Sequence, residues 1–144
     1  MTIYIHYGTN SYDKNKFKDI KNRYLMSKPL GGLWASEVND AYGWKQWCED
    51  NDYNMFSINK SFKFKLKKES NIVTINKVED LEKLPKIETE FNLWITLDFE
   101  KLVSLGVDAI KLNLSNDIRL YQALYGWDCD SILIMNKECI ELIK

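Results

Sequence analysis

The stretch YGWDCDSILIM, residues 125–135, joins a glycine turn and two acidic side chains to a strongly apolar run. The run 131–135 predicts a buried strand close to the end of the chain. Asp128 and Asp130 stand two residues apart before this strand, and side chains at that spacing point to the same side of an extended chain. We therefore expect a late strand of a central sheet with a pair of carboxyl groups at its mouth.

The rest of the chain alternates short strand-like segments with helix-like ones. Ser36 and Asp98 are predicted helix N-caps, and Gly106 and Gly126 are predicted to end helices. No repeat or linker divides residues 1–144, so the sequence predicts one α+β domain with strands from both ends in a central sheet. Other strands are expected at 3–7, 33–35, 56–66, 71–75, 107–112 and 139–143, and helices at 14–25, 36–50, 78–84, 98–105 and 115–125.

The charge balance argues against a nucleic-acid partner. The chain has 20 Lys and Arg against 21 Asp and Glu, a net charge of -1, whereas phosphate binding needs a positive surplus. Arg23 and Arg119 are the only arginines, so the usual reader of guanine is scarce. No apolar run reaches the roughly 18–20 residues of a membrane span, and the N-terminus lacks a secretion-signal pattern. We expect the cytoplasm of a bacterial cell and no membrane partner.

Cysteine and histidine usage excludes several enzyme classes. Cys48, Cys129 and Cys139 are odd in number and widely spaced, which predicts reduced thiols. His6 is the only histidine, so a zinc site built from Cys and His is not expected. A Cys/His hydrolase would need His6 to meet one of the cysteines in space, and no local signature supports that arrangement.

Two further motifs suit a ligand site. In HYGT, residues 6–9, Gly8 ends the first strand, where it would let a planar ligand lie against the backbone; a plain turn is the alternative. In GGLWASEVNDAYGW, residues 31–44, aromatic side chains follow two glycines at Trp34, Tyr42 and Trp44. Aromatic faces attract a planar cationic heterocycle, although aromatics at helical spacing also build cores.

The charged segments also allow more than one interpretation. Paired acids such as Asp128 and Asp130 can stabilise a positive transition state, or they can simply be turn residues. The lysines of residues 60–68 alternate with apolar side chains, which predicts the solvent face of an amphipathic strand. A phosphate or RNA patch is the alternative for these lysines.

In this order, the three motifs resemble those of the ADP-ribosyltransferase superfamily, which includes poly(ADP-ribose) polymerases, diphtheria-like toxins and small phage anti-CRISPR ADP-ribosyltransferases. Those proteins carry a histidine–glycine pair on the first strand, a glycine-led second strand before a tyrosine-bearing helix, and an acid that opens a late strand. The matched motifs are short but follow one another along most of the chain. The resemblance implies a split, mixed or antiparallel sheet with peripheral helices.

The resemblance also implies which residues bind NAD. Gly8 would hold the nicotinamide carboxamide through its backbone, with Thr9 beside it. Trp34 and Tyr42 would flank the nicotinamide ring. Ser36 matches a hydroxyl that follows the second strand in several branches of the superfamily.

The same resemblance assigns the catalytic acid. Asp130 would bind a ribose hydroxyl and stabilise the oxocarbenium-like transition state, with Asp128 as the second candidate. The family usually has glutamate here, and it places histidine directly before glycine, whereas Tyr7 separates His6 from Gly8 in this chain. Either Tyr7 binds the ribose, or a bulge brings His6 into that role.

The implied activity is that of an NAD-dependent mono-ADP-ribosyltransferase, a glycosyltransferase that modifies a macromolecule, a protein rather than a nucleic acid. Cleavage of the nicotinamide–ribose bond has a cationic transition state that a carboxylate stabilises, as in glycoside cleavage. The leaving group is already positively charged, so one histidine and no metal suffice. NAD is thus the expected substrate. The alternatives are an NAD glycohydrolase toxin and an inactive protein-binding inhibitor module on the same fold.

Overall fold

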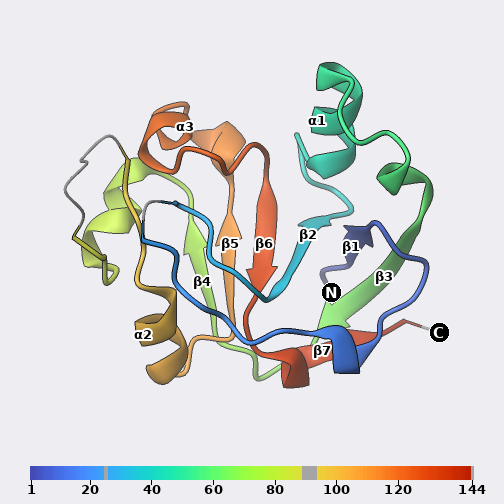
Figure 1. The fold of residues 1–144 in the computed structure, drawn as a ribbon, viewed down its shortest axis with the longest axis horizontal. Coiled ribbons are helices and arrows are strands. Elements are labelled where there is room, and N and C mark those ends of the chain that lie inside the picture. Colours follow the sequence, from blue (N-terminus) through green and yellow to red (C-terminus); the bar gives the residue numbers. More distant parts are fainter. Residues whose placement is uncertain (25, 89–93, 144) are drawn as a thin grey trace.

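A mixed β-sheet forms the frame of the structure, a computed structural model that describes residues 1–24, 26–88 and 94–143. The strand order is β4-β5-β6-β2-β1-β3-β7, and neighbouring strands are antiparallel except for the parallel pair β4 and β5 (Figure 1). The strands are β1 (Tyr4–Tyr7), β2 (Leu33–Glu37), β3 (Ser61–Leu66), β4 (Ile72–Ile75), β5 (Ala109–Leu112), β6 (Ser131–Ile134) and β7 (Ile140–Leu142).

The described helices are short. The α-helices are α1 (Trp44–Asn51), α2 (Phe99–Ser104) and α3 (Leu120–Ala123). Short 3₁₀ segments occupy Lys14–Lys16, Ser57–Asn59, Val78–Lys83, Leu114–Asn116 and Lys137–Cys139. None of the helices in the described ranges has the length and apolar character that a membrane crossing requires.

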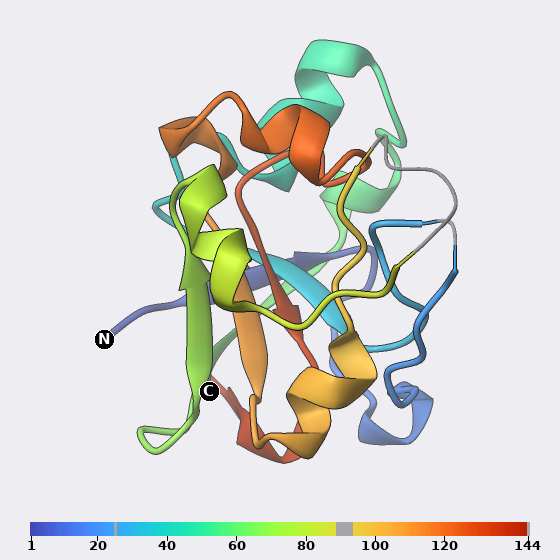
Figure 2. The ribbon, with the colours of Figure 1, turned by 90° about the vertical axis from the view of Figure 1, so that its left-hand side faces the viewer.

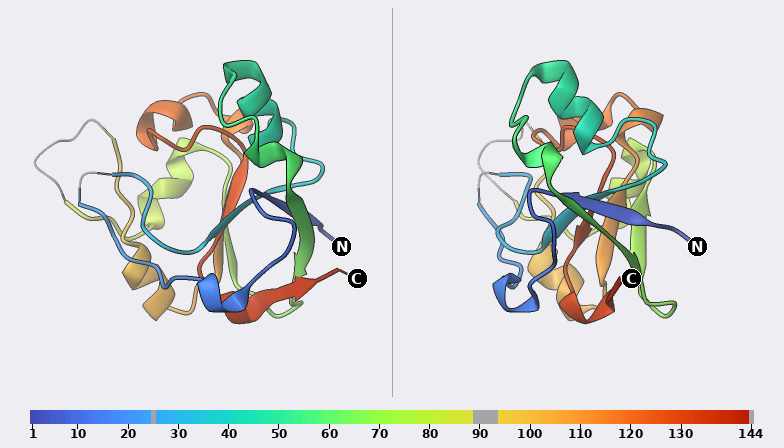
Figure 3. Two further views of the ribbon diagram at one scale, coloured as in Figure 1. Left: turned by 45° about the vertical axis from the view of Figure 1, so that its right-hand side comes forward. Right: turned by 90° about the vertical axis from the view of Figure 1, so that its right-hand side faces the viewer.

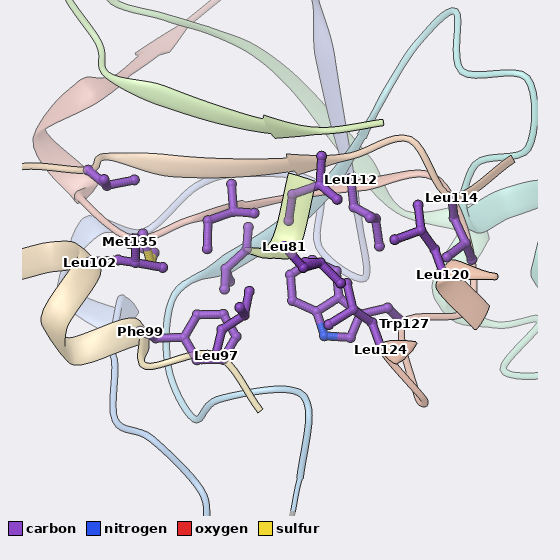
Figure 4. Close-up of a cluster of buried hydrophobic side chains, with 14 of the residues drawn as sticks. Leu81, Leu97, Phe99, Leu102, Leu112, Leu114, Leu120, Leu124, Trp127 and Met135 are labelled. Atoms are coloured by element: carbon purple, nitrogen blue, oxygen red, sulfur yellow. The ribbon is translucent and has the colours of Figure 1, made fainter. Parts of the chain in front are cut away.

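Two hydrophobic cores lie on opposite faces of the central strands. The larger core packs β5 and β6 against α2, α3 and the 3₁₀ turn at 78–83, with Trp127 at its centre (Figures 2 and 4). The smaller core joins Tyr4 and Phe64 of one half of the sheet to Ile132 and Ile134 of the other. Because both faces are covered, every residue of β5 and β6 is buried, as is typical of central strands.

The sheet is split between β1 and β2. Tyr4 and Ile5 pair with Glu37 and Ser36, and the pairing stops there. Beyond this point β1 follows β3 up to Tyr7, while residues 33–35 of β2 pair with β6. Figure 3 shows β1 running across the direction of β5 and β6. The two strands therefore diverge and leave room between them for a cavity.

Most predicted strands are confirmed, as is the α+β fold class. Every predicted strand overlaps an observed one, although 56–66 begins only at Ser61. The capping predictions at α2 also hold, because Asp98 accepts a hydrogen bond from the backbone N of Lys101 and Gly106 adopts a positive φ of 86°. Helix 78–84 is a 3₁₀ turn, Val78–Lys83.

The predicted helix at 14–25 is wrong. Within the described part of this range, residues 14–24, only Lys14–Lys16 is helical, as a 3₁₀ turn, and the backbone of Lys21 then exchanges two hydrogen bonds with Leu30. A Cβ on Gly31 would lie 2.2 Å from the carbonyl oxygen of Asp19, so the glycine is needed for this close approach of two chain segments. Phe17 and Ile20 have helical spacing but do not share a helix face. Ile20 packs in the larger core and Phe17 against the smaller one.

Two other helix predictions need correction. Ser36 lies inside β2, and α1 begins at Trp44, yet the Ser36 hydroxyl still accepts a hydrogen bond from the Trp44 backbone N at 3.0 Å. Ser36 thus caps the helix from a neighbouring strand. Ser115 lies within the 3₁₀ turn Leu114–Asn116, and the four-residue α3 follows separately, so residues 115–125 do not form one helix.

A buried ion pair ties the loop after β2 to the central strand β5. Nζ of Lys111 lies 2.9 and 3.1 Å from the two carboxylate oxygens of Asp40, and the side chains are only 4% and 6% exposed. The Asp40 carboxylate also accepts a hydrogen bond from the backbone N of Glu37. The pair therefore fixes the position of the segment between β2 and α1.

Asp40→Ala is expected to lower the free energy of unfolding by about 3–5 kcal/mol, because it leaves the Lys111 ammonium buried without a counter-charge. Urea denaturation followed by tryptophan fluorescence measures this change. Glu138→Ala is the matched control, since Glu138 pairs with Lys14 through side chains 58% and 52% exposed, and it should be much less destabilising. Equal losses in the two variants would contradict the role given to Asp40.

Candidate functional site

A cavity of about 310 Å³ lies in the gap between β1 and β2. Its volume is at the lower end of the range for small-molecule sites, roughly 300–1,000 Å³. Apolar and aromatic side chains make up most of the wall, with a few polar groups among them. The lining residues are Ile5, His6, Tyr7, Gly8, Lys28, Trp34, Ala35, Trp44, Asn54, Ser57, Trp127, Asp128, Cys129 and Ser131.

His6 bridges the gap where the strands part. Its Nδ1 lies 2.6 Å from the carbonyl oxygen of Trp34, so Nδ1 carries the proton and donates it to this bond. Burial lowers the pKa of His6, which is therefore neutral at pH 7 and keeps an unprotonated Nε2. His6 and Tyr7 both line the cavity, so both remain candidates to bind a ligand hydroxyl.

Trp34, Lys28 and Asp128 form a cation-binding arrangement within the cavity. Nζ of Lys28 lies 5.3 Å from the centre of the Trp34 ring and 3.9 Å from Oδ2 of Asp128. Trp127 packs edge-on against Trp34 at 4.8 Å and holds the ring in place. An aromatic face beside a carboxylate favours a positive charge, and here the ammonium of the protein's own lysine occupies this position.

Burial shifts the acidity of two groups in the wall. It raises the pKa of Asp128, and the nearby Lys28 ammonium offsets part of this rise. It also raises the pKa of the Cys129 thiol to about 12. Cys129 is thus a neutral thiol at pH 7, which does not suit the nucleophile of a Cys/His hydrolase.

Asp130 lies away from the cavity and is 2% exposed. Its carboxylate accepts hydrogen bonds from the backbone N of Tyr42 at 3.1 Å, the backbone N of Ser115 at 2.8 Å and the Ser115 hydroxyl at 2.7 Å. The expectation that Asp128 and Asp130 share one side is therefore wrong, because residues 128–130 precede β6 and do not follow its extended pleat. Among the described residues that line the cavity, Asp128 is the only one with a carboxylate.

Ser36 and Tyr42 lie behind the cavity wall. The Ser36 hydroxyl donates to the carbonyl oxygen of Asp130 at 3.0 Å, in addition to capping α1. The backbone of Tyr42 exchanges hydrogen bonds with Asp130 in both directions. Neither side chain lines the cavity, so neither is placed to contact a ligand there, and Ser36 instead holds the backbone of Trp44, a residue of the cavity wall.

Gly8 and Thr9 lie where β1 ends. Gly8 has a φ of 122°, and its N–H already donates to the carbonyl oxygen of Lys60 at 2.8 Å. The Gly8 N–H is therefore not available to the carboxamide of a ligand unless β1 and β3 separate. Thr9 lines a second cavity of about 290 Å³, which also touches His6. His6 thus separates two adjoining cavities.

Several lining residues were not identified from the sequence. Trp127 stands in the quoted stretch beside the acids, so an aromatic residue next to a functional carboxylate is a signal that could have found it. Lys28 has no such signal, because it lies in an irregular segment and reaches Trp34 only through the fold. Asn54 and Ser57 likewise come from the connection between α1 and β3.

Comparison with protein-family models, with curated proteins and with solved structures found no match in any of the three. In the described ranges, no group of three or more His, Cys, Asp or Glu side chains is arranged to hold a metal ion. Inference about function therefore rests on the geometry of the cavity.

Asp130→Ala is expected to lower the free energy of unfolding by about 3 kcal/mol, because it removes the acceptor of three hydrogen bonds from Tyr42 and Ser115. Chemical denaturation monitored by circular dichroism measures the loss. Asp128→Ala is the control two residues away, with a side chain 35% exposed, and should change stability by less than about 1 kcal/mol. A larger loss for Asp128→Ala than for Asp130→Ala would reverse the two roles.

Proposed function

We propose that the cavity binds the nicotinamide end of NAD and that the protein is an NAD-dependent mono-ADP-ribosyltransferase acting on a protein. One observation carries this proposal: the face of Trp34 and the carboxylate of Asp128 already enclose a positive charge, that of Lys28. The nicotinamide ring of NAD is a planar cation, so the same two groups can bind it, through its charge and through stacking on Trp34. Lys28 would have to move aside when such a ring enters.

The size of the site supports a ligand with more than one part. A cavity of about 310 Å³ suits a nicotinamide–ribose unit better than a whole dinucleotide. The second cavity, beyond His6, combines polar side chains, among them Tyr12, Asp13 and Lys16, with the apolar side chains of Phe17, Leu33 and Phe62. The buried Tyr12 hydroxyl has no hydrogen-bond partner among the described residues, so a ligand hydroxyl or phosphate there would satisfy it.

Three residues of the cavity then have a definite part in the reaction. The carboxylate of Asp128 stabilises the positive charge that develops at the ribose carbon as its bond to nicotinamide breaks. The unprotonated Nε2 of neutral His6 accepts a hydrogen bond from a ribose hydroxyl. The ring of Trp34 orients the leaving group. Asp130 acts through Tyr42 and Ser115, as a positioning residue.

Binding of 1-methylnicotinamide, a planar cation without ribose or phosphate, tests the cation site. Lys28→Met should raise its affinity several-fold, because the competing ammonium is gone. Asp128→Asn should lower its affinity about tenfold. Neutral nicotinamide is the matched ligand, and both substitutions should change its affinity much less. Isothermal titration calorimetry measures each constant, and equal effects on the two ligands would contradict a cation site.

The affinity for 1-methylnicotinamide should also depend on pH. Only the ionised carboxylate attracts the cation, and burial raises the pKa of Asp128. Affinity should therefore rise as the pH rises through this pKa and stay constant above it. On acidification the loss should begin at a higher pH than for an exposed aspartate, whose pKa is about 3.9. If the affinity of the wild type did not change over this pH range, Asp128 would not be part of the cation site.

Incubation with NAD labelled in the adenylate part and a bacterial lysate tests the activity. The wild type should transfer label to protein, and Asp128→Ala should reduce the rate about 100-fold or more while remaining folded. Glu82→Gln, at an exposed acid that lines neither cavity, should transfer as the wild type does. Free labelled ADP-ribose without labelled protein would indicate an NAD glycohydrolase. No binding and no turnover of NAD would leave a protein-binding module.

A further inference from the structure

The segment between α1 and β3 exposes a run of apolar side chains beside the cavity. Tyr53, Met55 and Phe56 are 52%, 40% and 89% exposed, and we call these three residues the apolar ridge. A buried Phe side chain removes much apolar area from water, so leaving one almost fully exposed is unfavourable. Grouped exposed apolar residues of this kind mark interaction surfaces. In Figure 1 the segment descends from α1 at the top of the molecule.

The apolar ridge is held in place by backbone hydrogen bonds. Asp52 ends α1 in the left-handed region with a φ of 49°, and its N–H bonds to the carbonyl oxygens of Cys48 and Glu49. Asn54 has the same φ, and its carbonyl accepts hydrogen bonds from both the N–H and the hydroxyl of Ser57. The exposed side chains therefore project from an ordered turn.

Two stacked tryptophan rings of α1 pack against the apolar ridge. Trp44 and Trp47 stack with centroids 5.1 Å apart, and both rings contact Tyr53 edge-on, at 6.0 and 5.3 Å. Trp44 also lines the cavity, as do Asn54 and Ser57. The apolar ridge and the cavity thus share a wall.

Acids outnumber bases around the apolar ridge. Glu49, Asp50 and Asp52 lie at the C-terminal end of α1, next to the apolar ridge, whereas the exposed lysines of this stretch, Lys45 and Lys60, stand at its two ends. Glu49 lies on the cavity side, because its charge adds to burial in raising the pKa of Tyr7. Acidic side chains beside aromatic faces attract cationic side chains and repel phosphates. This electrostatic pattern opposes nucleic acid and favours a basic protein.

We infer that the apolar ridge and its acidic surroundings are the docking surface for an arginine- or lysine-rich segment of a partner protein, with Phe56 as the apolar anchor. Docking there brings the partner to the mouth of the cavity. That the docked protein is also the acceptor of ADP-ribose rests on the proposed function, whereas the docking does not.

The test uses two labelled ten-residue peptides, one alternating Arg with Leu and the other alternating Glu with Leu, in fluorescence anisotropy with the full chain. The wild type should bind the basic peptide more tightly. Phe56→Ala should weaken this binding about tenfold, as for a central anchor. Glu49→Gln/Asp52→Asn should weaken it and flatten its salt dependence. Both polar replacements preserve side-chain shape, and Asn tolerates the left-handed conformation of residue 52.

Leu105→Ala is the matched control, since Leu105 is 63% exposed and follows α2 at the opposite end of the molecule in Figure 1. It should bind the basic peptide as the wild type does. No preference for the basic peptide, or equal losses for Leu105→Ala and Phe56→Ala, would overturn the inference. Phe56→Ala and Leu105→Ala should both keep wild-type affinity for 1-methylnicotinamide, since neither side chain lines the cavity. Peptide binding without any NAD binding would reject the proposed function alone, and NAD binding without peptide preference would reject the docking surface alone.

Discussion

The separation of β1 from β2 is the constraint on which the site depends. The two edges of β2 pair over different residues. Residues 33–35 pair with β6, whereas only Ser36 and Glu37 pair with β1. A continuous ladder would fill the gap with backbone hydrogen bonds. Instead, the His6 ring takes the carbonyl of Trp34 as its partner, so the gap stays open without leaving that carbonyl unpaired.

Buried carboxylates hold the wall of this gap from behind. Asp130 binds the backbone of Tyr42 and Ser115, and Asp40 binds Lys111, so both ends of the segment between β2 and α1 are anchored to the central strands. Asp128 has none of these partners and faces the cavity. Two acids separated by one residue thus differ in role because of their surroundings, since their chemistry is identical. A buried, fully hydrogen-bonded carboxylate positions the chain, and a partly exposed one is available to a ligand.

The sequence predicted what depends on neighbouring residues and missed what depends on distant ones. Apolar runs located all the strands, and the cap at Asp98 and the turn at Gly106 are local signals. The helix expected at 14–25 failed because Lys21 pairs with Leu30 across a turn, so its backbone groups are satisfied outside any helix. Within the site, His6, Tyr7, Gly8, Trp34 and Asp128 do line one cavity, whereas Lys28 reaches it through a contact that no periodicity encodes.

Because Lys28 occupies the cation site, the affinity of a ligand depends on its negative groups as well as on its positive one. A ligand cation must displace the Lys28 ammonium from Trp34 and Asp128, so a simple monocation gains only the difference between two similar attractions. A ligand that also carries negative groups gains more, because the displaced ammonium can then pair with them and loses little. The arrangement therefore favours a ligand with a planar cation at one end and anionic groups nearby. On the proposed function, the pyrophosphate of NAD supplies those groups, and the selectivity comes from an exchange of partners within the cavity rather than from an empty pocket.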